Sequence, residues 1–206
     1  MGKVKAHGGL QVLHLLREAI GEAGNTGRFE TTCAILARKI FANEVKTATD
    51  AFQELREFYP NDDEFRQAFS VKQERNNTKA QYFLKGIERE ARRVDMGAAA
   101  GETQLSDSLT LEHILPKNPS EEWKSETAAD KALVEECVFR LGNMCLLTTV
   151  NKDIGRKSFE EKKAAYKDSD ILTTRGVVNY GHWDRKNIEH RQVWFAKLAA
   201  GAWRFQ

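Results

Sequence analysis

One histidine in the chain stands beside a carboxylate and shortly before a proline. The segment reads LTLEHILP, residues 109–116, and its polar pair is Glu112 and His113. Histidine titrates near neutral pH and can take a proton from water, whereas a carboxylate is a ligand for a hard divalent cation. The pair could therefore hydrolyse a phosphodiester, with His113 as the general base and Glu112 as a metal ligand.

A second polar set lies in the segment LGNMCLLTTVNKDIGRKS, residues 141–158. The amide oxygen of Asn151 could join Glu112 on the metal. Asn143 could hold the imidazole of His113 in one tautomer and one orientation, as a third group does for catalytic histidines generally. These two asparagines complete a candidate site of one base, two oxygen ligands and one orienting amide.

Basic residues are densest directly after this segment's apolar run. Lys152, Arg156 and Lys157 lie in the turn, where we expect them to contact phosphates. Three further lysines follow on the next predicted helix, and for these a solvated helix face is at least as good an interpretation: Lys162, Lys163 and Lys167.

The local pattern predicts two strands and a helix that position these residues. Alternating apolar residues in 109–115 predict a half-buried strand that Pro116 ends, and the run 144–150 predicts a buried strand. Ser158 with Glu161 is a capping-box signal for a helix. A regular strand directs residues 112 and 113 to opposite faces, so both serve one site only if the strand ends or bulges there.

Each candidate also has a structural interpretation, although the combined spacing favours the site. His113 could be a satisfied structural histidine and Glu112 an exposed strand carboxylate. Asn143 could be a turn residue, and Asn151 could cap a helix.

The remaining patterns are helical, which makes the expected fold class α+β and mostly helical. We expect residues 1–102 to form an N-terminal helical bundle and residues 103–206 to form the domain with the site and a long C-terminal helix. Helical spacing predicts helices over 10–20, 29–45 and 48–59, and further helices after Asn61, after Thr78, over 128–140 and after Trp183. In the last of these, Asp184 or Asn187 is the expected cap, and the inward stripe is Ile188, Arg191, Phe195 and Leu198. We expect Arg191 to make a buried or partly buried ion pair and not to contact DNA.

Composition limits the class of protein. The chain has 206 residues, 41% hydrophobic and 30% charged, with a net charge of +2, which excludes a uniformly basic nucleic-acid binder. Its three cysteines form no Cys-x-x-Cys pair, so neither a zinc ribbon nor a disulfide framework is supported. We expect no membrane-spanning segment and no signal peptide, and a cytoplasmic location.

The pattern EHILP, then LGN, then Asn151 and a Phe-x-x-Lys helix resembles the His-Me finger (HNH) nucleases. It particularly resembles the C-terminal nuclease domain of GmrSD-type, modification-dependent restriction enzymes, over about residues 64–203. The resemblance also includes Phe65, Tyr82, Leu84, Phe159, Lys162, Tyr166, Trp183, Ile188, Arg191 and Trp203.

The resemblance implies a ββα-metal finger within a helical domain and a role for each site residue. His113 would be the general base, Glu112 and Asn151 the metal ligands, Asn143 the residue that fixes the base, and Lys157 a basic residue near the scissile phosphate. Asn151 stands where many HNH nucleases have histidine. This oxygen-rich site favours Mg²⁺ or Mn²⁺ over zinc or nickel.

The resemblance further implies a DNA endonuclease of a modification-dependent restriction and anti-phage system. Its substrate would be DNA, with or without modified bases. The resemblance also implies a separate NTPase or specificity domain or subunit as partner, and the chain itself has no G-x-x-x-x-G-K-[ST] phosphate loop. The alternatives are a catalytically silent DNA- or protein-binding subunit and a ribonuclease.

Overall fold

The computed structural model describes residues 26–58, 61–97, 105–106, 108–121, 123, 131–148 and 154–203. The expected helix over 10–20 and nearly all of the alanine-glycine linker at 97–102 lie outside the described residues. The chain divides into two compact units, Met1–Ala68 and Phe69–Gln206. No helix among the described residues has both the length and the apolar character that crossing a membrane requires.

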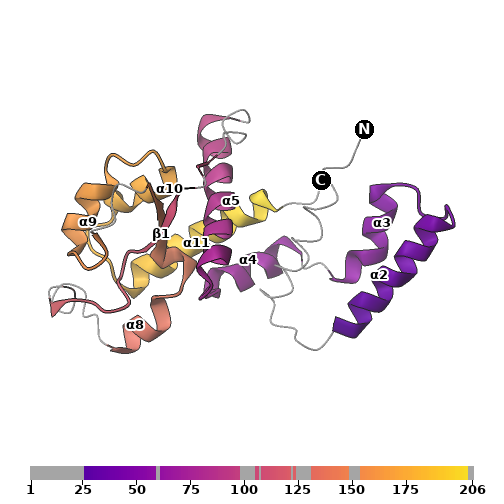
Figure 1. Cartoon of the computed structure of the whole chain (residues 1–206), viewed down its shortest axis with the longest axis horizontal. Coiled ribbons are helices and arrows are strands. Elements are labelled where there is room, and N and C mark those ends of the chain that lie inside the picture. The colour runs from indigo at the N-terminus through magenta and orange to yellow at the C-terminus, as the bar shows by residue number, and fades with distance from the viewer. Residues whose placement is uncertain are drawn as a thin grey trace. The chain divides into compact units, whose positions relative to one another are not determined.

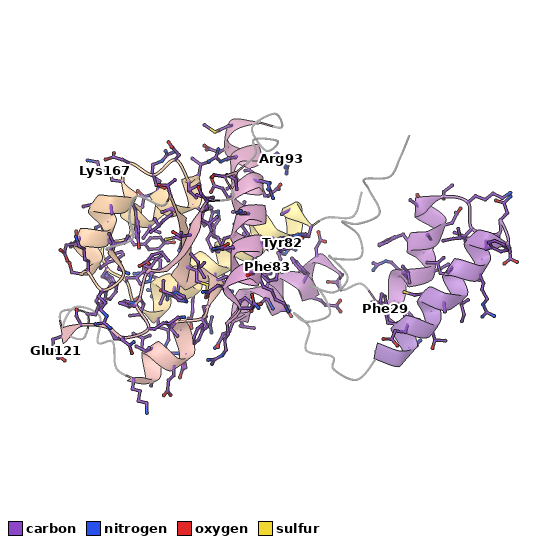
Figure 2. The ribbon with its side chains drawn as sticks, in the orientation of Figure 1. Phe29, Tyr82, Phe83, Arg93, Glu121 and Lys167 are labelled. Atoms are coloured by element: carbon purple, nitrogen blue, oxygen red, sulfur yellow. The ribbon has the colours of Figure 1, made fainter. Side chains whose placement is uncertain are left out.

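The described part of the first unit consists of short helices. Helix α2 is Thr26–Phe41, α3 is Ala48–Leu55, and the 3₁₀ turn η1 is Arg56–Phe58. A capping box between Thr47 and Asp50 starts α3. The ring of Phe29 (Figure 2) packs edge-on against that of Phe58, with centroids 5.3 Å apart.

The next two helices begin at asparagine caps. Helix α4, Asp62–Val71, begins after Asn61 as expected, and Asn61 forms a capping box with Glu64. Helix α5, Asn77–Met96, is capped by Asn76, so it begins one residue before the expected Thr78.

Helix α5 packs against the C-terminal helix α11, Arg185–Ala202, in the second unit. Phe69 and Phe83 meet edge-on, and Trp203 packs against both rings. Tyr82 and Phe83 project from α5 (Figure 2), and Trp203 donates to the Tyr82 hydroxyl at 3.3 Å. The expected cap of α11, Asp184, is confirmed, since its side chain accepts from the backbone N–H of Asn187.

A two-stranded antiparallel sheet lies at the centre of the second unit. Strand β1 is Thr110–His113 and strand β2 is Met144–Leu147. Every residue of β2 is buried, whereas β1 is half-buried. Strand β1 ends at His113, earlier than the expected end at residue 115. Between the strands come helix α8, Lys131–Cys137, and the 3₁₀ turn η2, Leu141–Asn143.

Helix α9, Phe159–Tyr166, follows the sheet in sequence and covers one side of it. The capping box of Ser158 and Glu161 is formed as expected. Figure 1 shows β1 between α9 and α5, and both helices contact it. Two short elements, α10 at Leu172–Arg175 and η4 at Gly176–Asn179, connect α9 to α11. The described fold is therefore α+β and mostly helical.

The division between the two units differs from the boundary expected at residue 102. Helix α5 belongs to the second unit, where its buried face contacts β2, α10 and α11. Ala80, Phe83, Leu84, Ile87 and Ala91 form that face. Val94, which the helical spacing places on the same stripe, is instead 65% exposed.

Candidate active site at the end of the hairpin

His113 is the last residue of β1 and is half-buried. Its ring stands perpendicular to the ring of Phe139, with centroids 6.0 Å apart. Burial, together with the nearby charges of Lys117 and Lys162, lowers the pKa of His113 from 6.5 to about 4. The imidazole is therefore neutral at physiological pH, the form that can accept a proton.

One nitrogen of this ring is left without a partner. The Nε2 atom of His113 is buried and makes no hydrogen bond to any described residue. An unsatisfied buried polar atom costs free energy, and a catalytic role is one explanation for such an atom in a native fold. A nitrogen that accepts a proton from a bound reactant provides one.

Glu112 points to a different neighbour from His113. The two residues pair in regular register with Cys145 and Met144, so β1 neither bulges nor ends between them. Successive side chains of a regular strand point to opposite faces. A shared site depended on a bulge or an early end of the strand; β1 has no bulge, and it ends at His113. The Glu112 carboxylate faces α9, where the Lys162 ammonium donates to its Oε1 at 2.5 Å.

Lys162 is fully buried, although we considered a solvated helix face for it. Besides Glu112, its ammonium donates to the backbone carbonyl of His113 at 2.8 Å and lies 5.8 Å from the ring centroid of Trp123. Burial lowers the pKa of Lys162, and the charge of Glu112 opposes this effect. One side chain thus fixes both the carboxylate of residue 112 and the main chain of residue 113. Its helical spacing with Phe159 and Tyr166, both buried, is the sequence signal for its burial.

Asn143 does not hold the imidazole through its side chain, so the expected contact is corrected. Its amide forms four hydrogen bonds to other groups. The Oδ1 atom accepts from the Leu115 N–H at 2.8 Å and from the Trp183 indole at 2.9 Å. The Nδ2 atom donates to the carbonyls of Leu115 and Val138 at 3.0 and 3.2 Å. These bonds use the full capacity of the amide, so Asn143 holds the backbone two residues after His113 instead.

Gly142 and Arg191 hold the LGN segment, residues 141–143, against helix α11. A Cβ at residue 142 would lie 2.4 Å from the backbone oxygen of Ile188, so only glycine allows α11 to approach this closely. Arg191 donates to the carbonyls of Gly142, Met144 and Thr173 at 2.7 to 3.0 Å. It forms no ion pair with a described residue, so the expected ion pair was wrong. The guanidinium fixes the turn before β2 through backbone oxygens.

The remaining expected site residues lie in or next to the segment before α9. Asn151 and Lys152 are outside the described residues, so the structure gives no position for them. Arg156 and Lys157 are exposed, and the carbonyl of Lys157 accepts a hydrogen bond from the Trp123 indole at 2.7 Å. The basic turn therefore presents two cations to solvent immediately before Ser158 starts α9.

The chemistry of the site can be compared with the divalent metal that the resemblance implies. Glu112 is a hard oxygen donor, and its Oε2 accepts no hydrogen bond from the described residues. Its Oε1 is already paired with Lys162, which competes with a metal for the same charge. The part of the chain that the structure describes contains no group of three histidine, cysteine, aspartate or glutamate residues arranged to hold a metal. Among the described residues, the site therefore offers a metal one unpaired carboxylate oxygen, Oε2 of Glu112.

A comparison with known families identifies the family of this chain. No curated protein sequence matches the chain. A family model described as "GmrSD restriction endonucleases, C-terminal domain" matches residues 59–198. The match includes α4, α5, the hairpin, α9 and nearly all of α11. The chain therefore belongs to the family of GmrSD restriction endonuclease C-terminal domains.

Proposed function

We propose that this chain is a metal-dependent DNA endonuclease of the HNH type, with His113 as the general base. The observation that carries the proposal is the His113 ring, which is neutral at physiological pH and has an unpartnered Nε2. The family, which is one of restriction endonucleases, supports nucleic acid as the substrate. In this reaction, Nε2 takes a proton from the water that attacks the phosphorus atom.

The proposal assigns Glu112 and Asn151 as ligands of Mg²⁺ or Mn²⁺. Such an ion, when bound, supplies positive charge to the phosphoryl and leaving oxygens. Lys162 orients the Glu112 carboxylate through a 2.5 Å contact, and Asn143 holds the backbone after His113. The arrangement of a hairpin followed by α9 is what a ββα-metal finger requires, which supports this assignment.

The basic turn is proposed to contact the substrate. Lys152, Arg156 and Lys157 would bind phosphates next to the scissile one. The exposure of Arg156 and Lys157 supports this role. The wider role we propose is cleavage of modified DNA in an anti-phage restriction system, in cooperation with a separate NTPase or specificity domain or subunit. The proposed location is the cytoplasm.

A second candidate function is a catalytically silent DNA- or protein-binding subunit. The observation in its favour is the ion pair of Glu112 with the buried Lys162, which satisfies the carboxylate without a metal. Under this alternative, the same residues would hold the hairpin together and cleave nothing.

Incubation of supercoiled plasmid with Mg²⁺ or Mn²⁺ distinguishes the two functions. Wild type should nick or linearise the plasmid, and His113→Ala should be slower by about 100-fold or more, as expected for loss of a general base. His190→Ala is the matched control, because residue 190 is an exposed histidine on α11. Modified plasmid and a single-stranded RNA form further arms. Equal cleavage by His113→Ala and wild type would remove His113 from the mechanism, and no cleavage by wild type on any substrate would favour the silent subunit.

A further inference from the structure

Two cations meet the aromatic ring that packs against His113. The guanidinium carbon of Arg75 lies 4.3 Å from the ring centroid of Phe139. The ammonium of Lys117 lies 5.2 Å from the same centroid, and the His113 ring meets it edge-on at 6.0 Å. We call Arg75, Lys117 and Phe139 the ring cluster. It lies beside the proposed base and includes none of the basic residues of the turn before α9.

The segments that carry the ring cluster are tied together by backbone contacts. Gln73 forms an isolated antiparallel bridge with Arg140, and the N–H of Glu74 donates to the carbonyl of Phe139 at 2.8 Å. The Gln73 side chain also donates to the carbonyl of Glu136 at 3.0 Å. The segment between α4 and α5 is therefore held against the residues that follow α8.

The Asn143 amide holds the backbone two residues before Lys117. That amide bonds the N–H and the carbonyl of Leu115, and Pro116 separates Leu115 from Lys117. Proline restricts the backbone between the two residues. Both cations thus stem from anchored backbone, and contact with an aromatic face further restricts their side chains.

Neither cation has a carboxylate partner among the described residues. Arg75 and Lys117 are both exposed, and no described acidic side chain lies within ion-pair distance of either. Other exposed or half-exposed arginines of this unit do have partners: Arg92 with Glu88, Arg93 with Glu90 and Arg185 with Glu136. The nearest glutamate in sequence to Arg75, Glu74, is buried, faces Lys72 at 3.9 Å and accepts from the N–H of Asn76.

Arg75 and Lys117 are unpaired and oriented next to the proposed base, an arrangement that suits an anionic ligand that approaches that base. Phosphate oxygens are the usual acceptors for such arginine and lysine side chains, and these contacts fix the register of a nucleic acid without reading its bases. Lys117 and His113 both lie against the ring of Phe139, at centroid distances of 5.2 and 6.0 Å. A phosphate bound to Lys117 would therefore lie near the proposed base.

We propose that Arg75 and Lys117, oriented by the ring of Phe139, bind the phosphate backbone of the nucleic acid beside His113. This inference rests on the proposed function, because it names further substrate contacts for the same site. It places part of the substrate path over the segment between α4 and α5, on the side of β1 away from α9. The basic turn and the ring cluster would then contact different stretches of the strand.

The test is equilibrium binding of a fluorescent DNA duplex, measured by anisotropy at several salt concentrations with chelator present. All proteins are full-length and carry His113→Ala, so that binding is measured without cleavage. Arg75→Gln with Lys117→Gln is compared with a control that loses the same charge, Arg89→Gln with Lys197→Gln. The control residues are exposed on α5 and α11 and lie outside the ring cluster. Circular dichroism verifies that each variant is folded.

The ring-cluster double variant should bind about 10- to 100-fold more weakly at 0.1 M salt, and its slope of log affinity against log salt should fall by about 2. The control should keep the slope of the parent protein. Phe139→Leu keeps both charges, and we expect it to bind more weakly because the cations lose their orienting ring. Equal slopes for the parent and the ring-cluster variant, or equal losses in variant and control, would overturn the proposal.

Four further results are decisive. Absence of binding by the parent protein at low salt would overturn the inference. If an acidic polypeptide of matched charge binds with the same dependence on Arg75 and Lys117, the surface belongs to a protein partner and the inference fails. Because binding is measured without catalysis, failure of plasmid cleavage with intact ring-cluster binding would remove only the proposed nuclease function. If wild type cleaves plasmid but DNA binding does not depend on Arg75 and Lys117, only this inference is removed.

Discussion

Replacing Asn143 with alanine tests how the site is held. The structure assigns this side chain to the backbone after His113, through four buried hydrogen bonds of 2.8 to 3.2 Å. Alanine would leave two carbonyls, one backbone N–H and the Trp183 indole without these partners. Each buried polar group left unsatisfied costs about 1–3 kcal/mol.

Because neighbouring contacts are not additive, we expect Asn143→Ala to lower the free energy of unfolding by about 3–6 kcal/mol. The total free energy of unfolding of a domain is about 5–15 kcal/mol, so the variant should be severely destabilised. Trp183→Phe removes one donor to the same amide and keeps the other three bonds, so it should cost about 1–2 kcal/mol, including the lost ring volume. This milder variant keeps the test informative if Asn143→Ala does not fold.

The assay is urea denaturation followed by circular dichroism, with plasmid cleavage measured on the same preparations. Loss of stability in the order Asn143→Ala, then Trp183→Phe, then wild type is the expected result. If Asn143 acted by orienting the imidazole, Asn143→Ala would lose cleavage and keep nearly the stability of wild type. That outcome would refute the backbone-clamp reasoning.

Three more substitutions follow from the same geometry. The pKa of His113 is lowered from 6.5 to about 4 in the folded chain, so the unfolded chain binds a proton first on acidification. Between these pH values the free energy of unfolding of wild type should fall by up to about 3 kcal/mol relative to that of His113→Gln. Urea denaturation with chelator at each pH measures this difference, and parallel curves of unfolding free energy against pH would contradict the shift. Gly142→Ala should cost about 2–3 kcal/mol through overlap with Ile188 and Gln192, and Gly155→Ala, which meets no atom within 4 Å, should be neutral in thermal melts. Lys162→Met leaves Glu112 without its cation and should cost about 3 kcal/mol, and added Glu112→Gln should restore much of that loss in the same melts.

Local signals in the sequence predicted the elements around the site. The capping box at Ser158, the cap at Asp184 and the helix start after Asn61 are confirmed, because each depends only on residues within one turn. The alternating run before His113 and the apolar run after Asn143 correctly predicted the two strands. The predicted inward stripe of α11 is also confirmed, since Ile188, Arg191, Phe195 and Leu198 are all buried.

Contacts between distant segments could not be predicted in this way. The ion pair of Lys162 with Glu112 joins residues 50 positions apart, and lysine is seldom fully buried. The four partners of Asn143 come from three separate segments, so the spacing of residues 113 and 143 indicated proximity but not the bonds formed. The same holds for Arg75 and Phe139, which only the folded chain brings together. Spacing can predict which residues gather, whereas the hydrogen bonds depend on the packing of α9, α11 and the turn before β2.

The most direct measurement of the central claim is chemical rescue of His113→Ala by free imidazole in the plasmid assay. If His113 is the general base, the variant should cleave about 100-fold or more slowly than wild type. Added imidazole, which supplies the missing ring, should raise its rate in proportion to the concentration of the neutral form, with no such increase for wild type. Cleavage by the variant at the wild-type rate, or a folded and DNA-binding variant that imidazole does not accelerate at all, would contradict the assignment of His113 as the base.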